Sequence, residues 1–218
     1  VLVNVVMPLG ILAMFVAGGI AFYQRDLKRM LAFSSVSQIG YILVGLSFMS
    51  SKGLTAAIVH LFNHGITKGL LFMCAGVIFL RYKTSFYKEI SGLGRIMPWT
   101  SAAFLIGGLS LIGIPGTAGF ISKWILVQAA LEQGSWLIAL SILLSSLIAV
   151  LYVWQVTEIM YFGDSSKKGA EISVGPFSYI TIWILAGATI FFGLSTSFTL
   201  EYSSEAAWVL INEFSLTN

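Results

Sequence analysis

The chain has 218 residues, of which 57% are hydrophobic and only 10% are charged, and its net charge is +3. Soluble domains carry about 45–50% apolar and about 25% charged residues, so this composition excludes an ordinary soluble domain and predicts an integral membrane protein. The basic residues lie near the ends of apolar segments, so they indicate membrane orientation rather than nucleic-acid binding. A single cysteine, Cys74, excludes an intramolecular disulfide and any cysteine-based metal motif.

Six membrane-spanning helices are predicted, because a bilayer core of about 30 Å requires about 20 apolar residues per helix. Pro8 is expected to kink the first helix, and Asp26 to cap the second. No segment alternates like a β-strand, so the fold class is all-α. The expected spans are residues 2–22, 26–49, 54–80, 97–133, 136–161 and 177–198, which makes 1–198 the transmembrane domain and 199–218 a short interfacial or soluble tail.

The fourth span, residues 97–133, is too long for one straight helix and carries GIPGTAG at 113–119. It is either one interrupted span or two spans with a turn. One interrupted span puts nine basic residues on one side of the membrane and Lys52 on the other, whereas two spans give seven against three. The positive-inside rule therefore favours one interrupted span, with loops 23–29, 81–95 and 163–175 on the cytoplasmic side of the plasma (inner) membrane. The nine residues are Arg25, Lys28, Arg29, Arg81, Lys83, Lys88, Arg95, Lys167 and Lys168.

The interruption has a chemical consequence at membrane depth. Backbone groups that lose their helical partners there are tolerated only where protein or water satisfies them. We therefore predict a hydrated cavity at the break, and Lys123 follows the break closely enough for its amine to reach that cavity. The residues expected to break the helix are Gly113, Pro115, Gly116 and Gly119.

A row of ionisable side chains lies in the third span, within the sequence HLFNHGITK at 60–68. His60, His64 and Lys68 are four residues apart, and on a helix this spacing drifts only about 40° per step, so the row covers about 12 Å of one face. A charged lysine at mid-bilayer costs roughly 2.5–3.5 kcal/mol. Because histidine titrates near neutral pH, the row predicts a proton path through His60, His64, Lys68 and Lys123.

Structural interpretations of the same residues stay open. His60 and His64 have the spacing of two zinc ligands, but no third ligand shares their face and HExxH is absent. The two lysines could extend to the headgroups or pair with a carboxylate. Glu158 is either an interfacial carboxylate or an accessory group of the path. Ser34 and Gln38 could line water or bond to their own helix.

Three motifs in this order resemble one family of membrane proteins. They are DLKR at 26–29 with SSVSQIG at 34–40, HLFNH at 60–64 with KGLLF at 68–72, and LSLIGIP at 109–115 with GFISK at 119–123. The pattern is similar to the antiporter-like subunits shared by Mrp-type cation/proton antiporters and respiratory complex I. The resemblance covers nearly the whole chain.

The resemblance implies a fourteen-helix fold with two inverted five-helix repeats, of which this chain would be the second repeat and the last helix. The chain enters an apolar segment at Val1, so we expect a piece of a longer polypeptide. In the family, the counterparts of His60, His64 and Lys68 carry protons along a central axis, and the counterpart of Lys123 lies at its output end. The expected partners are other membrane subunits of the assembly.

Trp124 directly follows Lys123, at a position where the larger members of this family carry an acidic residue, and the chain stops soon after Phe198. The resemblance is therefore to the Mrp D subunit first, with Na⁺ or K⁺ as candidate exchanged cations. A proton-pumping subunit of a complex I-like NADH-quinone oxidoreductase, or of a related membrane hydrogenase, is the alternative. No flavin, quinone or iron-sulfur motif is present, so no cofactor is expected and redox chemistry would belong to partners.

Two further classes of function stay open from the residues alone. A structural membrane module would only dock partner subunits, with its lysines neutral and packed. A substrate transporter would bind a solute at the broken helix, because such sites use interrupted helices.

Overall fold

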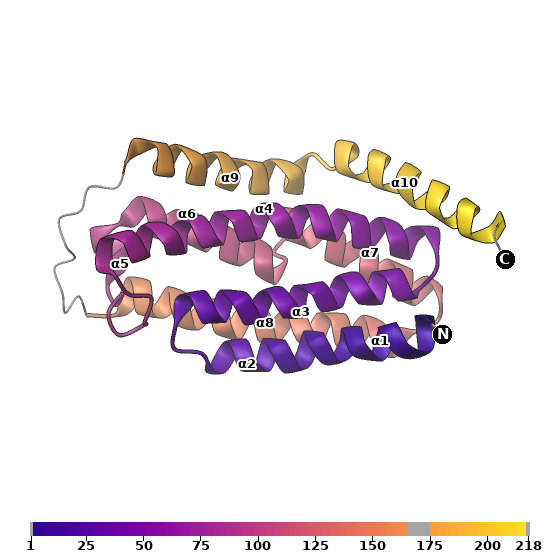
Figure 1. Ribbon diagram of the computed structural model, residues 1–218, viewed down its shortest axis with the longest axis horizontal. Helices are drawn as coiled ribbons and strands as arrows, with labels where there is room; N and C mark the ends of the chain where they lie inside the picture. The colour runs from indigo at the N-terminus through magenta and orange to yellow at the C-terminus, as the bar shows by residue number, and fades with distance from the viewer. Residues whose placement is uncertain (1, 165–174, 217–218) are drawn as a thin grey trace.

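A computed structural model describes residues 2–164 and 175–216, and these form long helices joined by short connections (Figure 1). Val1, the C-terminal residues 217–218, and Lys167 and Lys168 of the expected basic loop lie outside the described residues. The elements are α1 (Leu2–Leu12), the π-helical turn η1 (Ala13–Ala17), α2 (Gly18–Tyr23), α3 (Leu27–Ser47), α4 (Ser51–Tyr82), α5 (Leu93–Ile96), α6 (Pro98–Ile112), α7 (Ala118–Glu132), α8 (Trp136–Phe162), α9 (Pro176–Leu194) and α10 (Ser197–Leu216).

The described residues contain five helices that are long and apolar enough to cross a membrane, and these begin at Val3, Leu27, Ser51, Trp136 and Pro176. Helices α6 and α7 follow one another along the bundle, separated by residues 113–117, and supply the interrupted fourth span (Figure 1). The all-α fold with six spans, the fourth of them discontinuous, is therefore confirmed.

One helix irregularity was not expected from the sequence. Helix α1 contains Pro8 without interruption, and regular α-helical geometry is lost further along, at η1. There the Met14 carbonyl accepts hydrogen bonds from Ser37 Oγ at 2.9 Å and Ser145 Oγ at 3.4 Å, as expected where a π-turn frees a carbonyl from the helix ladder.

The last span is shorter than expected, because α9 ends at Leu194 and a new helix begins at Ser197. The expected tail 199–218 therefore begins inside α10, which packs against α4 and follows α9 end to end (Figure 1). The C-terminal end of α9 packs closely against the break in the fourth span. A Cβ at Gly193 would lie 2.4 Å from the Thr117 carbonyl carbon, so only glycine permits this contact.

The apolar core is divided into two clusters along the bundle. One cluster gathers at the α5 end and includes Leu31, Leu70 and Leu111; the other gathers toward the opposite end and includes Val44 and Leu126. Between them, α3, α4, α6, α7 and α8 bury polar side chains. This polar layer consists of Ser34, Ser37, Gln38, His60, Asn63, Thr67, Lys68, Ser110, Ser122, Lys123 and Ser145.

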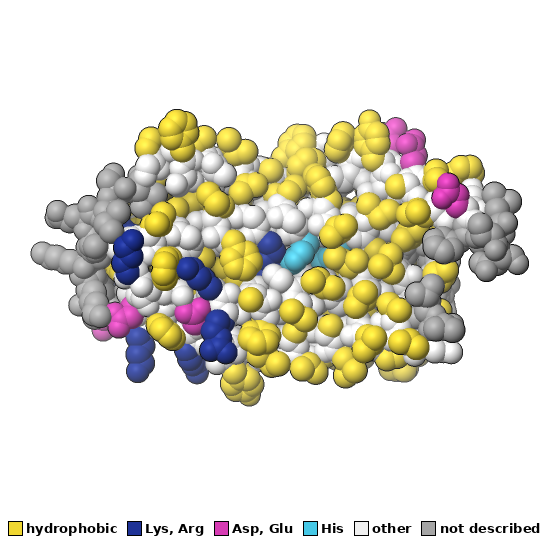
Figure 2. All heavy atoms as spheres, viewed as in Figure 1, with side chains coloured by type: hydrophobic (Ala, Val, Ile, Leu, Met, Phe, Trp, Pro, Cys, Tyr) yellow, Lys and Arg dark blue, Asp and Glu magenta, His cyan; other side chains and the backbone are white. Residues whose placement is uncertain are grey.

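The described basic residues are concentrated at one end of the bundle. Seven of them lie in or beside the connections that join α2 to α3 and α4 to α6, where Leu27 N bonds Ser85 O at 2.9 Å and Tyr87 N bonds Arg25 O at 3.0 Å. Figure 2 shows Lys and Arg side chains gathered at this end and hydrophobic side chains over much of the remaining surface. A hydrophobic belt with a basic end is the expected surface of a membrane protein.

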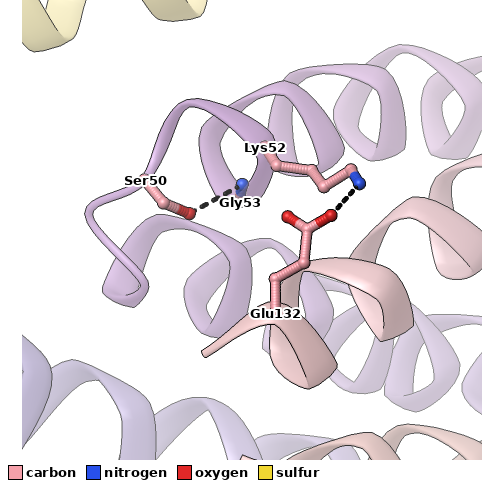
Figure 3. A network of polar contacts seen from close by, with 4 residues as sticks. All are labelled: Ser50, Lys52, Gly53 and Glu132. Carbon is pink, nitrogen blue, oxygen red and sulfur yellow. Dashed lines mark hydrogen bonds and ion pairs between the residues drawn. The ribbon is translucent and has the colours of Figure 1, made fainter. Parts of the chain in front are cut away.

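An ion pair joins α4 to α7 at the opposite end. Lys52 Nζ contacts Glu132 Oε1, and Ser50 Oγ caps α4 by accepting from Gly53 N at 3.1 Å (Figure 3). The two side chains of the ion pair are 39% and 59% exposed, so water screens their attraction. We expect Lys52→Gln to lower the free energy of unfolding by less than about 1 kcal/mol, measured by thermal unfolding of the detergent-purified full-length protein. A loss well above that value would contradict the expectation.

Candidate functional site

The fourth span is broken by two glycines in left-handed conformation, Gly113 with φ +95° and Gly116 with φ +88°. Gly113 also leaves room for the lysine that follows, because a Cβ there would lie 3.0 Å from Lys123 Cδ. Lys123 folds back over the break, and its Nζ donates to Leu111 O at 2.9 Å and Ile112 O at 3.0 Å. These carbonyls belong to the last turn of α6, where helix partners are missing and the helix dipole favours a cation.

Lys123 also lies against an aromatic ring. Its Nζ is 4.6 Å from the centroid of Tyr41, a fully buried residue of α3. The position suits a cation–π contact. The Tyr41 hydroxyl in turn lies 3.3 Å from Ser146 Oγ on α8, so the ring is held between two helices.

Lys68 is buried at 6% exposure and reaches across to α3. Its Nζ donates to Leu31 O at 2.8 Å and to Ser34 Oγ. No described carboxylate forms an ion pair with Lys68 or Lys123. Both amines are therefore held by uncharged oxygens, an arrangement in which the proton is not locked to a fixed counter-ion.

The two imidazoles of α4 stack between these lysines. Their ring centroids are 6.2 Å apart with an interplanar angle of 6°. His60 is buried and its Nδ1 lies 2.8 Å from Ser122 Oγ on α7, while His64 is half-buried. The spacing of four residues therefore places His60, His64 and Lys68 in one row, and Ser122 brings that row next to Lys123.

Polar side chains of α4 also secure the broken helix directly. Asn63 Nδ2 donates to Ala118 O at 2.7 Å, and Thr67 Oγ1 lies 2.9 Å from Ser110 Oγ. Ser110 Oγ accepts in addition from Gly119 N at 3.1 Å. The break and the ionisable row thus form one connected unit.

The three accessory candidates, Ser34, Gln38 and Glu158, do not all lie near the ionisable row. Ser34 contacts the Lys68 amine, and Gln38 is buried beside His60. Glu158 is exposed on α8, in the last turns toward the basic end, and makes no contact with the ionisable row. Glu158 therefore lies apart from the polar layer that contains the other candidates.

Several polar residues of this site were not predicted from the sequence. Tyr41, Asn63, Thr67, Ser110 and Ser122 each touch a candidate residue or the break. Asn63 and Thr67 could have been found, because they lie within the same polar run as His60 and Lys68. Tyr41, Ser110 and Ser122 look ordinary in the sequence, since serine and tyrosine are common in membrane helices.

The molecule is thus a multi-pass membrane protein whose interior holds ionisable side chains beside a broken helix. The sequence profile of a family described as NADH:quinone oxidoreductase/Mrp antiporter, TM matches residues 1–149. The chain belongs to this family of antiporter-like membrane subunits, which confirms the resemblance.

Two curated relatives are subunits of respiratory oxidoreductases or dehydrogenases. The chain is 39% identical over 169 residues to NADH-quinone oxidoreductase subunit N of Desulforudis audaxviator, covering 75% of this chain and 34% of the relative. It is 36% identical over 195 residues to F(420)H(2) dehydrogenase subunit L of Methanosarcina mazei, covering 81% of this chain and 29% of that relative. The chain therefore spans about a third of the length of these two curated relatives.

Solved structures share the fold. A chain of the Mrp complex from Dietzia sp. DQ12-45-1b superposes with a TM-score of 0.86 at 27% identity, over 94% of this chain and 46% of that chain. A chain of the membrane-bound sulfane sulfur reductase, an archaeal respiratory membrane complex, superposes with a TM-score of 0.87 at 28% identity, over 96% of this chain and 42% of that chain. These homologues are subunits of multisubunit membrane assemblies, and the comparisons do not specifically favour the Mrp assignment.

Proposed function

We propose that this chain forms half of a proton channel in an ion-translocating membrane subunit. The observation that carries the proposal is the polar layer between the two apolar clusters, in which three of the four ionisable groups are buried. Lys68, His64, His60 and Lys123 follow one another through this layer, and the last of them caps the broken helix. Ionisable residues at membrane depth are expensive and usually mark an ion or proton path.

The row has the properties that proton transfer requires. The two amines contact carbonyl and hydroxyl oxygens rather than carboxylates, so gaining or losing a proton does not break an ion pair. Imidazole can accept a proton at one nitrogen and release it from the other. In this proposal Lys68 receives the proton, the histidines pass it on, and Lys123 lies at the output end.

The assembly we propose is a redox-driven, complex I-like complex. The sequence relatives named as NADH-quinone oxidoreductase and F(420)H(2) dehydrogenase subunits support this choice. An Mrp-type monovalent cation/proton antiporter, expected first from the sequence, is the second candidate and is supported by the similarity to the Dietzia complex. In either case the basic end of the bundle would face the cytoplasm, by the positive-inside rule.

Proteoliposomes containing the complex with the full-length protein would test this proposal. We expect addition of the electron donor, with quinone present, to acidify or alkalinise the lumen, as followed by a pH-sensitive dye. Proton movement driven only by an imposed Na⁺ or K⁺ gradient would instead favour the antiporter. Absence of proton movement under both conditions, in vesicles shown to be sealed, would contradict proton translocation altogether.

A further inference from the structure

A small polar cavity lies beside His60, at the point where α3, α4, α6 and α7 meet. Its lining includes Gln38, His60 and Asn63, all at most 3% exposed. The cavity offers about 10 Å³ to the centre of a water-sized sphere. That volume is close to the minimum for one water molecule, roughly 10–15 Å³ by the same measure.

Three polar atoms of this lining make no hydrogen bond of normal geometry with the described residues. They are Gln38 Nε2, His60 Nε2 and Asn63 Oδ1. The opposite atoms of two of these side chains are engaged, since His60 Nδ1 contacts Ser122 and Asn63 Nδ2 donates to Ala118 O. A buried polar atom without a partner costs about 1–3 kcal/mol, so three around one cavity require an explanation.

We propose that this cavity binds one water molecule, held by Gln38, His60 and Asn63. The water accepts from Gln38 Nε2, donates to Asn63 Oδ1, and uses its remaining hydrogen-bonding capacity at His60 Nε2. Three hydrogen bonds are typical of a buried water. Either histidine tautomer is compatible, because water can donate to a bare nitrogen or accept from an N–H group.

A metal cation fits the same cavity poorly. Na⁺ and K⁺ require several oxygen ligands, whereas two of the three buried atoms without a partner, Gln38 Nε2 and His60 Nε2, are nitrogens. Water satisfies a mixed set of donors and acceptors, and a cation does not.

The water gives Gln38 a specific role. Its amide does not titrate, but it orients the water that contacts His60, which makes Gln38 a positioning residue for the ionisable row. The hydroxyl of Tyr152 also lies next to the Gln38 side chain and is a second polar neighbour of the amide, although no hydrogen bond of normal geometry joins them. The binding of the water does not depend on the proposed function. The role of the water on a proton route does rest on the proposed function.

Cryo-electron microscopy of the complex with the full-length protein, at a resolution that shows ordered water, tests the proposal. We expect density within about 3.2 Å of all three atoms in the unsubstituted protein. Gln38→Met keeps the side-chain length but removes the amide, so the density should be lost. Ile39→Met, at a 46% exposed position on the same helix, is the matched control and should retain the density.

Two results would overturn the water site. One is an unsubstituted protein without density in this cavity while other internal waters are visible; the other is density that persists unchanged in Gln38→Met. Proton translocation is then measured on the same variants. A loss in Gln38→Met but not in Ile39→Met supports the positioning role, and unchanged translocation in a Gln38→Met protein that has lost the water overturns it. Translocation by the unsubstituted protein reports on the proposed function separately.

Discussion

Lys123→Gln is expected to reduce proton translocation by roughly 100-fold or more, the lower end of what a positioned acid–base group contributes. Glutamine can still donate a hydrogen bond to Leu111 O or Ile112 O, so the end of α6 keeps a partner, but glutamine cannot carry a proton. Lys68→Gln is expected to act in the same way beside Leu31 O. The measurement is the initial rate of pH change in proteoliposomes containing the complex with the full-length protein.

The matched control is Lys52→Gln, because Lys52 belongs to α4, as Lys68 does, but lies in an exposed ion pair away from the polar layer. Its translocation rate should stay close to that of the unsubstituted protein. If Lys68→Gln and Lys123→Gln also left translocation unchanged, the proton path would be wrong. Neutral packed lysines in a docking module would then account for the site, and solute-dependent thermal stabilisation would instead support a substrate transporter.

Gly119→Ala is expected to destabilise the protein by more than about 3 kcal/mol, the upper end of ordinary overpacking costs. A Cβ at this position would lie 1.8 Å from Ser110 O, a backbone atom that cannot rotate away. Relief requires α7 to move away from α6, which would stretch the bond from Gly119 N to Ser110 Oγ. A lower midpoint of thermal unfolding, together with weaker assembly into the complex, would report this effect.

Gly187→Ala supplies the comparison for that experiment. Gly187 is an exposed residue of α9, and a Cβ there would meet no atom within 4 Å. Alanine favours the helix by roughly 0.5–1 kcal/mol over glycine, so this variant should be neutral or slightly more stable. Equal midpoints for Gly119→Ala and Gly187→Ala would show that the contact between α6 and α7 is less tight than the structure indicates.

Part of the site could be predicted from the sequence because it depends on one helix at a time. Helical periodicity places His60, His64 and Lys68 on one face, and the cluster of glycine and proline at 113–116 favours an end to the helix there. The distribution of basic residues then selected one interrupted span rather than two. Helix boundaries were less predictable: α9 ends at Leu194 and α10 begins at Ser197, within the segment expected to be the end of one span, and Gly193 there packs against Thr117 of the broken span.

The sequence by itself determined the membrane class, the six spans and the row of ionisable groups, since hydropathy and spacing act within a single helix. Only the tertiary structure decided which groups meet that row, because helix rotation and depth are set by packing between segments distant in the chain. Packing brings Tyr41 and Ser122 to the row and leaves Glu158 at the surface. It also folds Lys123 back onto α6, which joins the ionisable row to the broken helix.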